Sequence, residues 1–124
     1  MQYTSLGKLY VYQQSIDLCD LSWEIFESLS WQDKKIIGDQ FIRSIDSNAA
    51  NIAEGYGRYH YLDKIKFYYN ARASLLEAKH WMFLLFKRKK ITEQKFQETL
   101  KKADHIHYTL NKFIQSCYKA KKDY

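Results

Sequence analysis

The feature that most restricts the fold of this chain is the absence of proline from its 124 residues, which include only four glycines. Proline and glycine interrupt helices more often than other residues, so a chain with so few of them can form long helices. Apolar residues recur at intervals of three and four through most of the sequence, as they do on one face of an α-helix. With 46% hydrophobic residues, the chain can also build a packed core. The sequence therefore predicts an all-α fold.

Four amphipathic helices are expected in a single domain spanning residues 1–124, at residues 9–29, 31–55, 62–87 and 92–119. Ser30 and Asp33 fit the capping box that starts a helix, and Thr92 stands where it can cap the fourth helix. Short connections between long helices favour antiparallel neighbours. The expected architecture is an antiparallel up-down four-helix bundle.

The inward face of each helix is predicted from the apolar spacing. The inward residues of the first helix are expected to be Leu9, Tyr12, Ile16, Cys19, Trp23 and Phe26. Those of the second helix are Ile37, Phe41, Ile45 and Ile52, and those of the fourth are Phe96, Leu100, Ala103, His107, Leu110, Ile114 and Cys117. Gly55 and Gly57 are expected to end the second helix in left-handed conformations.

The third helix differs because it carries two adjacent apolar stripes. One stripe consists of Ala71, Leu75, Ala78, Met82 and Leu85, and the other of Tyr69, Ala73, Leu76, His80 and Phe83. Two stripes make a wider apolar face than one neighbouring helix needs. We therefore expect this helix to be central in the bundle or to bury a subunit contact.

The net charge of +6 is unevenly distributed along the chain. Residues 1–86 hold 9 basic and 10 acidic side chains, whereas residues 87–124 hold 11 basic and 4 acidic ones. Such an asymmetry suggests attraction to phosphate groups, and a lysine face that only keeps the protein soluble remains the alternative. The residues expected to contact phosphates are Lys87, Arg88, Lys89, Lys90, Lys101, Lys102, Lys119, Lys121 and Lys122.

Metal-dependent chemistry is not expected. Glu77 with His80, and Asp104 with His107, have the three-residue spacing that places both side chains on one helix face, as in di-iron bundles. In an antiparallel pair, however, the two sets would be offset by about 7.5 Å along the bundle axis. We therefore predict no metal and no cofactor.

Covalent and hydrolytic catalysis are not expected either. Cys19 and Cys117 lie on helical core stripes, where a thiol is usually inert. Arg72 and His80 are too far apart for the helical ribonucleases that need these residue types closely spaced. The pair Gly55 and Gly57 does not make a nucleotide loop, because no strand precedes it. The chain is predicted not to be an enzyme.

A membrane or secretory role is also not expected. The most apolar run, residues 81–86, is far shorter than the roughly 20 residues that a membrane span requires. The first residues show no charged region followed by an apolar one, so no secretory signal is apparent. The two cysteines are too far apart for a zinc knuckle, and a reducing cytoplasm is the expected setting.

Tyrosines alternate with cations in the stretch GYGRYHYLDKIKFYYNAR, residues 55–72. Such rings can stack on unpaired bases while the cations hold phosphates. The favoured interpretation is that the rings pack against the end of the bundle and leave their hydroxyl groups in water.

The most specific motif is FIRSIDSNAANIAEGYGR, residues 41–58, followed by a third helix that contains SLLE. It resembles the signature of the 23S ribosomal RNA intervening-sequence protein family. The matching positions are Arg43, Ser47, Asn51, Ile52, Ala53, Glu54, Gly55, Tyr56, Gly57, Arg58, Ser74, Leu75 and Glu77. Asn48 stands where the family usually has an aliphatic residue, and Ala49 where proline is frequent.

The resemblance implies a four-helix bundle in a small, cytoplasmic bacterial protein. It carries over no catalytic residues. A similar fold serves as the accessory protein of diversity-generating retroelements, a homopentamer that acts beside a reverse transcriptase. The implied partners are therefore further copies of the chain, with a pentamer favoured, and RNA or DNA or a reverse transcriptase.

The polar residues of the motif suggest a structural role. Ser47, Asn51, Glu54 and Arg58 share one face of the second helix and its exit. An antiparallel third helix would place Arg72 within reach of Asn51 and Ser47. We predict that these side chains fix the register between the two helices, because buried polar groups need partners.

Overall fold

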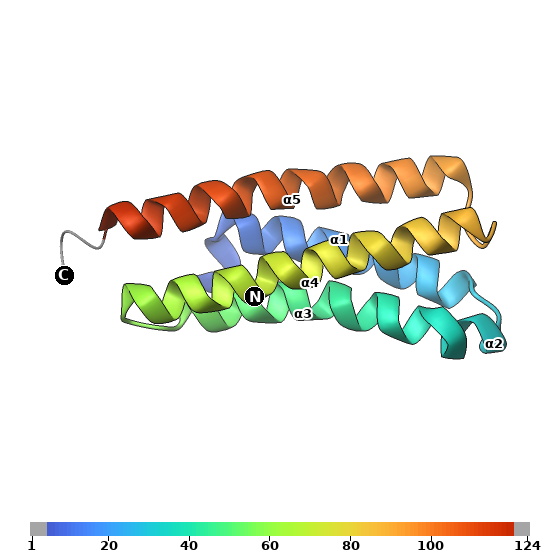
Figure 1. The fold of residues 1–124 in the computed structure, drawn as a ribbon, viewed down its shortest axis with the longest axis horizontal. Coiled ribbons are helices and arrows are strands. Elements are labelled where there is room, and N and C mark those ends of the chain that lie inside the picture. The colour runs from blue at the N-terminus through green and yellow to red at the C-terminus, as the bar shows by residue number, and fades with distance from the viewer. Residues whose placement is uncertain (1–4, 121–124) are drawn as a thin grey trace.

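The computed structural model describes residues 5–120 of the chain, and every regular element in this range is helical. The elements are η1 (Leu6–Lys8), α1 (Tyr10–Ser28), α2 (Trp31–Asp33), η2 (Lys34–Gly38), α3 (Asp39–Tyr56), α4 (Tyr61–Lys87) and α5 (Glu93–Ala120). The long helices run side by side along the longest axis of the molecule (Figure 1). This arrangement confirms the all-α fold and agrees with the antiparallel bundle.

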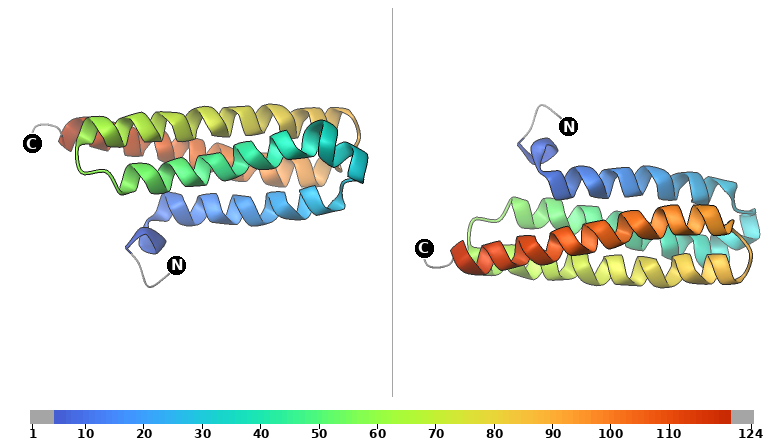
Figure 2. Two further views of the ribbon diagram at one scale, coloured as in Figure 1. Left: turned by 90° about the horizontal axis from the view of Figure 1, so that it is seen from below. Right: turned by 90° about the horizontal axis from the view of Figure 1, so that it is seen from above.

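The four long helices form a closed ring of neighbours. α3 packs most extensively on α4, and the pairs α1–α3, α4–α5 and α1–α5 are also in contact. The short helix η1 leaves the bundle at the end where α1 begins (Figure 2). Each long helix thus packs on the helices before and after it in the chain, and α5 closes the ring against α1. None of the helices within residues 5–120 is long and apolar enough to cross a membrane.

The helix expected over residues 31–55 is built from three consecutive elements, α2, η2 and α3. The backbone stays helical through residues 34–38, but this segment is π-helical. The hydroxyl of Ser30 accepts a hydrogen bond from the backbone amide of Asp33 at 3.1 Å, as the capping box requires. The Asp33 carboxylate does not complete the box, because it is paired with Lys90 at 3.1 Å.

The inward stripe of α1 was wrongly predicted. The buried positions are Val11, Ser15, Leu18, Leu21, Ser22 and Ile25, whereas Trp23 of the expected stripe is 50% exposed. Two serines interrupt the true core stripe, so the apolar spacing pointed to the neighbouring stripe, which is only partly buried.

Asn48 of α3 explains how a serine can lie in this core. Its side-chain amide donates to the hydroxyl of Ser15 at 3.1 Å, and that hydroxyl donates to the carbonyl of Val11 at 2.9 Å. Asn48 and Ser15 are both fully buried. Because a buried polar group needs a partner, this pair fixes the register between α1 and α3.

The two apolar stripes of α4 have different environments. All five residues of the first stripe are buried. In the second stripe Leu76 is 60% exposed, Phe83 48% and Tyr69 37%. Within one chain α4 is therefore not central, and its second stripe faces outward. In α5, Ile106 and Thr99 are fully buried, whereas Leu100, His107 and Cys117 of the expected stripe are only half-buried.

The glycines at the end of α3 do not adopt left-handed conformations, contrary to the prediction. Gly57 has a φ of −77°, and among the described residues the only positive φ is that of Lys89, at 61°. Gly55 is needed for a different reason. A Cβ at this position would lie 2.6 Å from Cε1 of Tyr68, so the ring of Tyr68 rests directly on the α3 backbone.

Candidate nucleic-acid interface

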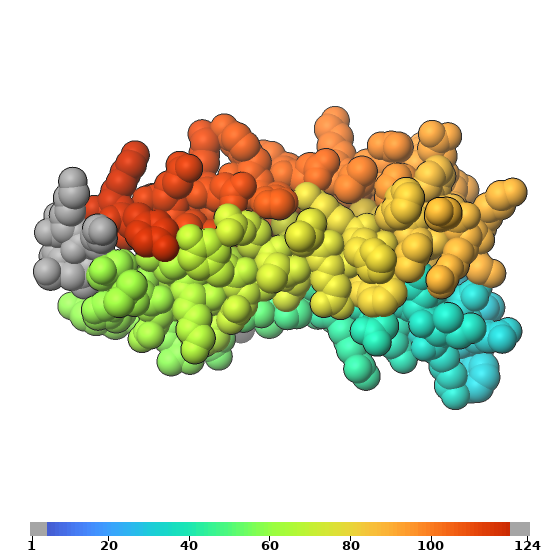
Figure 3. All heavy atoms as spheres, in the orientation of Figure 1, coloured from blue at the N-terminus to red at the C-terminus, as the bar shows by residue number. Residues whose placement is uncertain are grey.

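One solvent-facing stripe of α5 collects basic and aromatic side chains. Its members follow a spacing of four, three, four and seven residues, and all are exposed: Lys101, His105, Tyr108, Lys112 and Lys119. At 1.5 Å per residue the stripe is about 27 Å long. Long side chains project from this helix, which forms the upper edge of the molecule in Figure 3. We refer to these five residues as the α5 stripe.

Two acidic residues of α5, Glu98 and Asp104, are paired with lysines outside this stripe. Glu98 lies 3.8 Å from the ammonium group of Lys95, and Asp104 lies 2.7 Å from that of Lys79 on α4. Within residues 5–120 no carboxylate lies at ion-pair distance from the lysines of the α5 stripe. Their charges are therefore directed at solvent.

The aromatic members of the stripe lie beside its cations. The ammonium group of Lys112 lies 4.8 Å from the ring centroid of Tyr108. The hydroxyl of Tyr10, at the start of α1, is 2.8 Å from Nε2 of His105. Lys112, His105 and Tyr108 were not among the predicted contact residues. The signal that identifies them is helical spacing from Lys101, which only matters once the outward face of α5 is known.

The four basic residues of the predicted cluster at residues 87–90 have different environments in the structure. Lys87, Arg88 and Lys89 are exposed, whereas Lys90 is held by Asp33. The turn ends α4 with two hydrogen bonds. The amide of Lys89 donates to the carbonyl of Phe86 at 2.9 Å, and that of Lys90 to Leu85 at 2.8 Å. This is the Schellman pattern, with a lysine in the left-handed position that glycine usually occupies.

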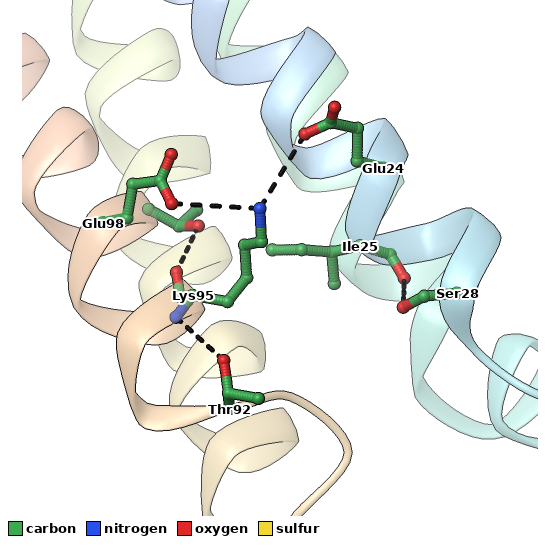
Figure 4. A network of polar contacts seen from close by, with 7 residues as sticks. Glu24, Ile25, Ser28, Thr92, Lys95 and Glu98 are labelled. Atoms are coloured by element: carbon green, nitrogen blue, oxygen red, sulfur yellow. Dashed lines mark hydrogen bonds and ion pairs between the residues drawn. The ribbon is translucent and has the colours of Figure 1, made fainter.

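Lys95 shows how a lysine of α5 can be neutralised (Figure 4). Its ammonium group lies between Glu24 of α1, at 3.9 Å, and Glu98 of α5, at 3.8 Å. The hydroxyl of Thr92 accepts a hydrogen bond from the amide of Lys95 at 3.1 Å, so Thr92 is the N-cap as predicted. A surface cavity of about 400 Å³ beside these side chains is therefore lined by charges of both signs.

The remaining predicted contact residues are Lys102, Lys121 and Lys122. Lys102 is half-buried and lines a groove between α1 and α5 with Gln14 and Lys101. Lys121 and Lys122 lie outside the described residues.

One hydrogen bond joins a signature side chain of α3 to a side chain of α4. The hydroxyl groups of Ser47 and Ser74 are 2.9 Å apart, which links the two helices. Asn51 instead donates to the carbonyl and hydroxyl of Ser47 on its own helix, at 2.9 and 3.1 Å. Glu54 and Arg58 form an exposed ion pair at 3.2 Å. Of the four polar side chains expected to fix the register between the helices, only that of Ser47 forms a hydrogen bond with α4.

The other signature side chains have partners that the motif did not suggest. The guanidinium of Arg58 lies 4.7 Å from the ring centroid of Phe67. Arg72 does not reach α3; it donates to the side-chain carbonyl of Asn111 on α5 at 2.7 Å. Glu77 accepts a hydrogen bond from the indole of Trp81 at 2.9 Å, and Arg43 is exposed.

A polar seam joins α4 to α5 near the middle of the bundle. The ammonium group of Lys79 lies 2.7 Å from Asp104 and 3.0 Å from Nδ1 of His107. Burial and then the nearby Lys79 and Arg72 lower the pKa of His107. The two acid–histidine pairs thus have protein partners, and the described residues contain no group of three side chains suited to a metal ion.

Comparison with known proteins agrees with the motif. The model of the 23S rRNA-intervening sequence protein family matches residues 7–112. The crystal structure of a protein of unknown function from the S23 ribosomal protein family, from Bacteroides thetaiotaomicron VPI-5482, is similar, with a TM-score of 0.79. The two sequences are 23% identical, and the match covers 84% of this chain and 97% of that one. At this identity the likeness shows the fold alone. No match was found among curated proteins.

Proposed function

The chain belongs to the 23S rRNA-intervening sequence protein family, and from this premise we propose that it is a non-enzymatic, cytoplasmic protein that binds RNA along α5. The observation that carries the proposal is the α5 stripe, whose lysines have no carboxylate partner within residues 5–120. Lys87, Arg88 and Lys89 extend the basic surface at the start of the same helix.

Binding would rest on phosphate contacts. Lysines that neutralise phosphates release counterions, so the affinity falls steeply as salt is added. Contacts of lysines to phosphates fix the position of a nucleic acid but carry no sequence information directly. The proposed binding is therefore sensitive to salt and tolerant of sequence.

Titration of a structured RNA at two salt concentrations tests the proposal, with filter binding as the readout. Replacing Lys101, Lys112 and Lys119 by Gln should reduce the slope of log K against log salt by about 2, if the lysines contact single-stranded phosphates. A matched control removes the same charge elsewhere, by replacing the exposed Lys8, Lys35 and Lys66 by Gln. Binding that is absent, independent of salt, or equally weakened by both triple variants would contradict the proposal.

We further propose that the chain forms a homo-oligomer, with a pentamer favoured, through the outward stripe of α4. Leu76, Phe83 and Tyr69 form a row of large apolar side chains with helical spacing, exposed in the single chain. Exposed apolar rows of this kind mark protein contacts. Leu76→Glu should lower the mass measured by light scattering to that of one chain, whereas the exposed Gln40→Glu should not.

The same stripe supports an alternative function. The protein could act as a scaffold or accessory subunit, for example for a reverse transcriptase, with lysines that only keep it in solution. An adjacent gene for a reverse transcriptase would favour this alternative, and a position inside a ribosomal RNA gene would favour RNA binding. A complex with the enzyme that survives the triple lysine substitution would also favour the scaffold.

A further inference from the structure

A second cavity, of about 240 Å³, opens where α3 ends and α4 begins. Four aromatic residues line it: Tyr56, Tyr61, Tyr68 and Phe113. Its volume is below the 300 to 1,000 Å³ of pockets for drug-sized ligands. The cavity therefore suits a single planar ring system.

The family signature builds two of its walls. Tyr56 comes directly from the EGYG segment. Tyr68 is only 1% exposed, and its ring can occupy its place because Gly55 has no side chain. The ring of Phe113 meets that of Tyr68 edge to face, with centroids 4.9 Å apart and an angle of 80° between the planes. The rings of Tyr68 and Phe113 thus pack directly on their neighbours.

Among the described residues that line the cavity, Lys64 is the one cation. Its ammonium group donates to the carbonyls of Gly55 and Tyr56 at 3.3 and 3.0 Å, at the carboxyl end of α3. An ammonium group has three hydrogens. One donor therefore remains for a carbonyl oxygen of a ligand, while the aromatic walls offer faces for stacking.

The cavity adjoins the basic surface of α5. Ser116 lies at its rim, on the helix that carries the α5 stripe. Lys112 and Lys119 are four and three residues from Ser116, so each lies about one helical turn away. A strand held by these lysines would bring its bases to the cavity.

We propose that this cavity binds one unpaired, carbonyl-bearing nucleobase of the RNA that lies on α5. Base stacking would occur on the aromatic walls, and Lys64 would donate to the carbonyl oxygen. The inference rests on the proposed RNA binding and deepens it, because it makes the protein prefer single-stranded segments over duplexes.

Alkylation of Cys117 tests the proposal on the unmodified chain, because this half-buried thiol lines the cavity. Iodoacetamide is added with oligouridylate, with an RNA duplex of the same charge, or with uridine monophosphate, and modification of each cysteine is followed by mass spectrometry. Cys19, on α1, is the internal control for unfolding. Oligouridylate should slow the modification of Cys117 about fivefold or more and leave Cys19 unchanged, whereas the duplex should protect neither.

The outcomes separate this inference from the proposed function. If oligouridylate binds but Cys117 is not protected, or if the duplex protects it equally, the cavity does not hold a base. If oligouridylate does not bind, the proposed function fails, and uridine monophosphate decides the inference: protection of Cys117 supports the site and its absence overturns it.

A variant that fills the cavity gives an independent test. Ser116 is exposed, so Ser116→Trp should fold and place an indole over the opening. We expect it to weaken oligouridylate binding by about fivefold or more without changing duplex binding. The control is Gln40→Trp, which adds the same side chain at an exposed position of α3. Equal loss for oligouridylate and duplex, or no loss for either, would overturn the proposal.

Discussion

The cations at the two ends of the bundle have different kinds of partner. At the turn end, where residues 88–92 connect α4 to α5, lysines are paired with carboxylates: Lys90 with Asp33 at 3.1 Å, Lys34 with Glu27 at 3.8 Å and Lys95 with Glu24 at 3.9 Å. At the pocket end, where residues 57–60 connect α3 to α4, Arg58 is paired with Glu54 at 3.2 Å, but other cations lie against carbonyls and rings. Lys64 donates to the end of α3, and Lys112 lies over Tyr108.

This difference shows that a run of basic residues does not by itself tell which of its cations are unpaired, since Lys90 of the run at residues 87–90 is paired with Asp33. The run at residues 87–90 is the densest in the chain, yet α1 and α2 bring carboxylates to the same end of the bundle. The lysines of the α5 stripe are sparser in sequence, but Glu98 and Asp104 of the same helix are paired with Lys95 and with Lys79 of α4. The surface potential therefore depends on acids contributed by distant segments.

The largest effect is expected from a test of packing at the two ends. Gly55→Ala at the pocket end would place a Cβ 2.6 Å from the ring of buried Tyr68, so we expect a loss of about 1–3 kcal/mol of unfolding free energy. Gly38→Ala at the turn end would meet only the side-chain atoms of Leu29 and Phe26, at 3.1 and 3.2 Å, and should cost less. Urea denaturation measures both. Equal losses would mean that the close approach of Tyr68 is not a constraint.

The next test compares the cations themselves. Replacing Lys112 and Lys119 by Gln should reduce the salt slope of RNA binding by about 1.4, since two phosphate contacts are lost. Replacing Lys90 and Lys95 by Gln removes the same charge at the turn end, where both lysines are already paired. It should change the slope less, and it should alter stability by no more than about 1 kcal/mol because exposed ion pairs contribute little. A larger change in the salt slope from replacing Lys90 and Lys95 would contradict the prediction.

A smaller effect is expected at the turn itself. Lys89 has a φ of 61°, a conformation that costs a residue with a side chain roughly 1–2 kcal/mol and glycine little. Lys89→Gly should therefore raise the unfolding free energy, by about 1 kcal/mol or less because glycine also gains freedom in the unfolded chain. Lys89→Ala, which removes the same charge but keeps the strain, is the control for thermal denaturation. A gain of equal size in both variants would point to charge rather than conformation.

The smallest effect is expected on the pH dependence of stability, through His107 in the polar seam that joins α4 to α5. The pKa of His107 lies below its ordinary value of 6.5, so the unfolded chain takes up this proton more readily than the folded one. Stability should therefore fall as the pH drops below about 6.5, and His107→Gln should flatten this dependence. His80→Gln, at an exposed histidine that packs on Trp81, should leave it unchanged. Thermal unfolding between pH 5 and pH 8 measures this dependence for each protein. An identical dependence of stability on pH in the wild type and in His107→Gln would contradict the prediction.

The helices could be read from the sequence because their causes are local. The spacing of apolar residues, the hydroxyls of Ser30 and Thr92 and the lack of proline act within a few residues of chain. The inward face of α1 could not be predicted, because its core stripe contains Ser15 and Ser22, and the contact of Ser15 with Asn48 joins residues 33 positions apart. The role of Gly55 was missed for the same reason, since it depends on the ring of Tyr68 in another helix.

The candidate interface also has features that depend on single residues and features that depend on contacts between distant segments. The sequence determined that the excess charge lies in the last third of the chain, because charge is a property of each residue. Only the packed bundle decided which lysines of that third have a carboxylate beside them, because the partners of Lys90 and Lys95 include Asp33 of α2 and Glu24 of α1. The aromatic cavity likewise requires α3, α4 and α5 to meet. Sequence thus determined the helices and the sign of the charge, and the tertiary structure decided where that charge and the tyrosine rings act together.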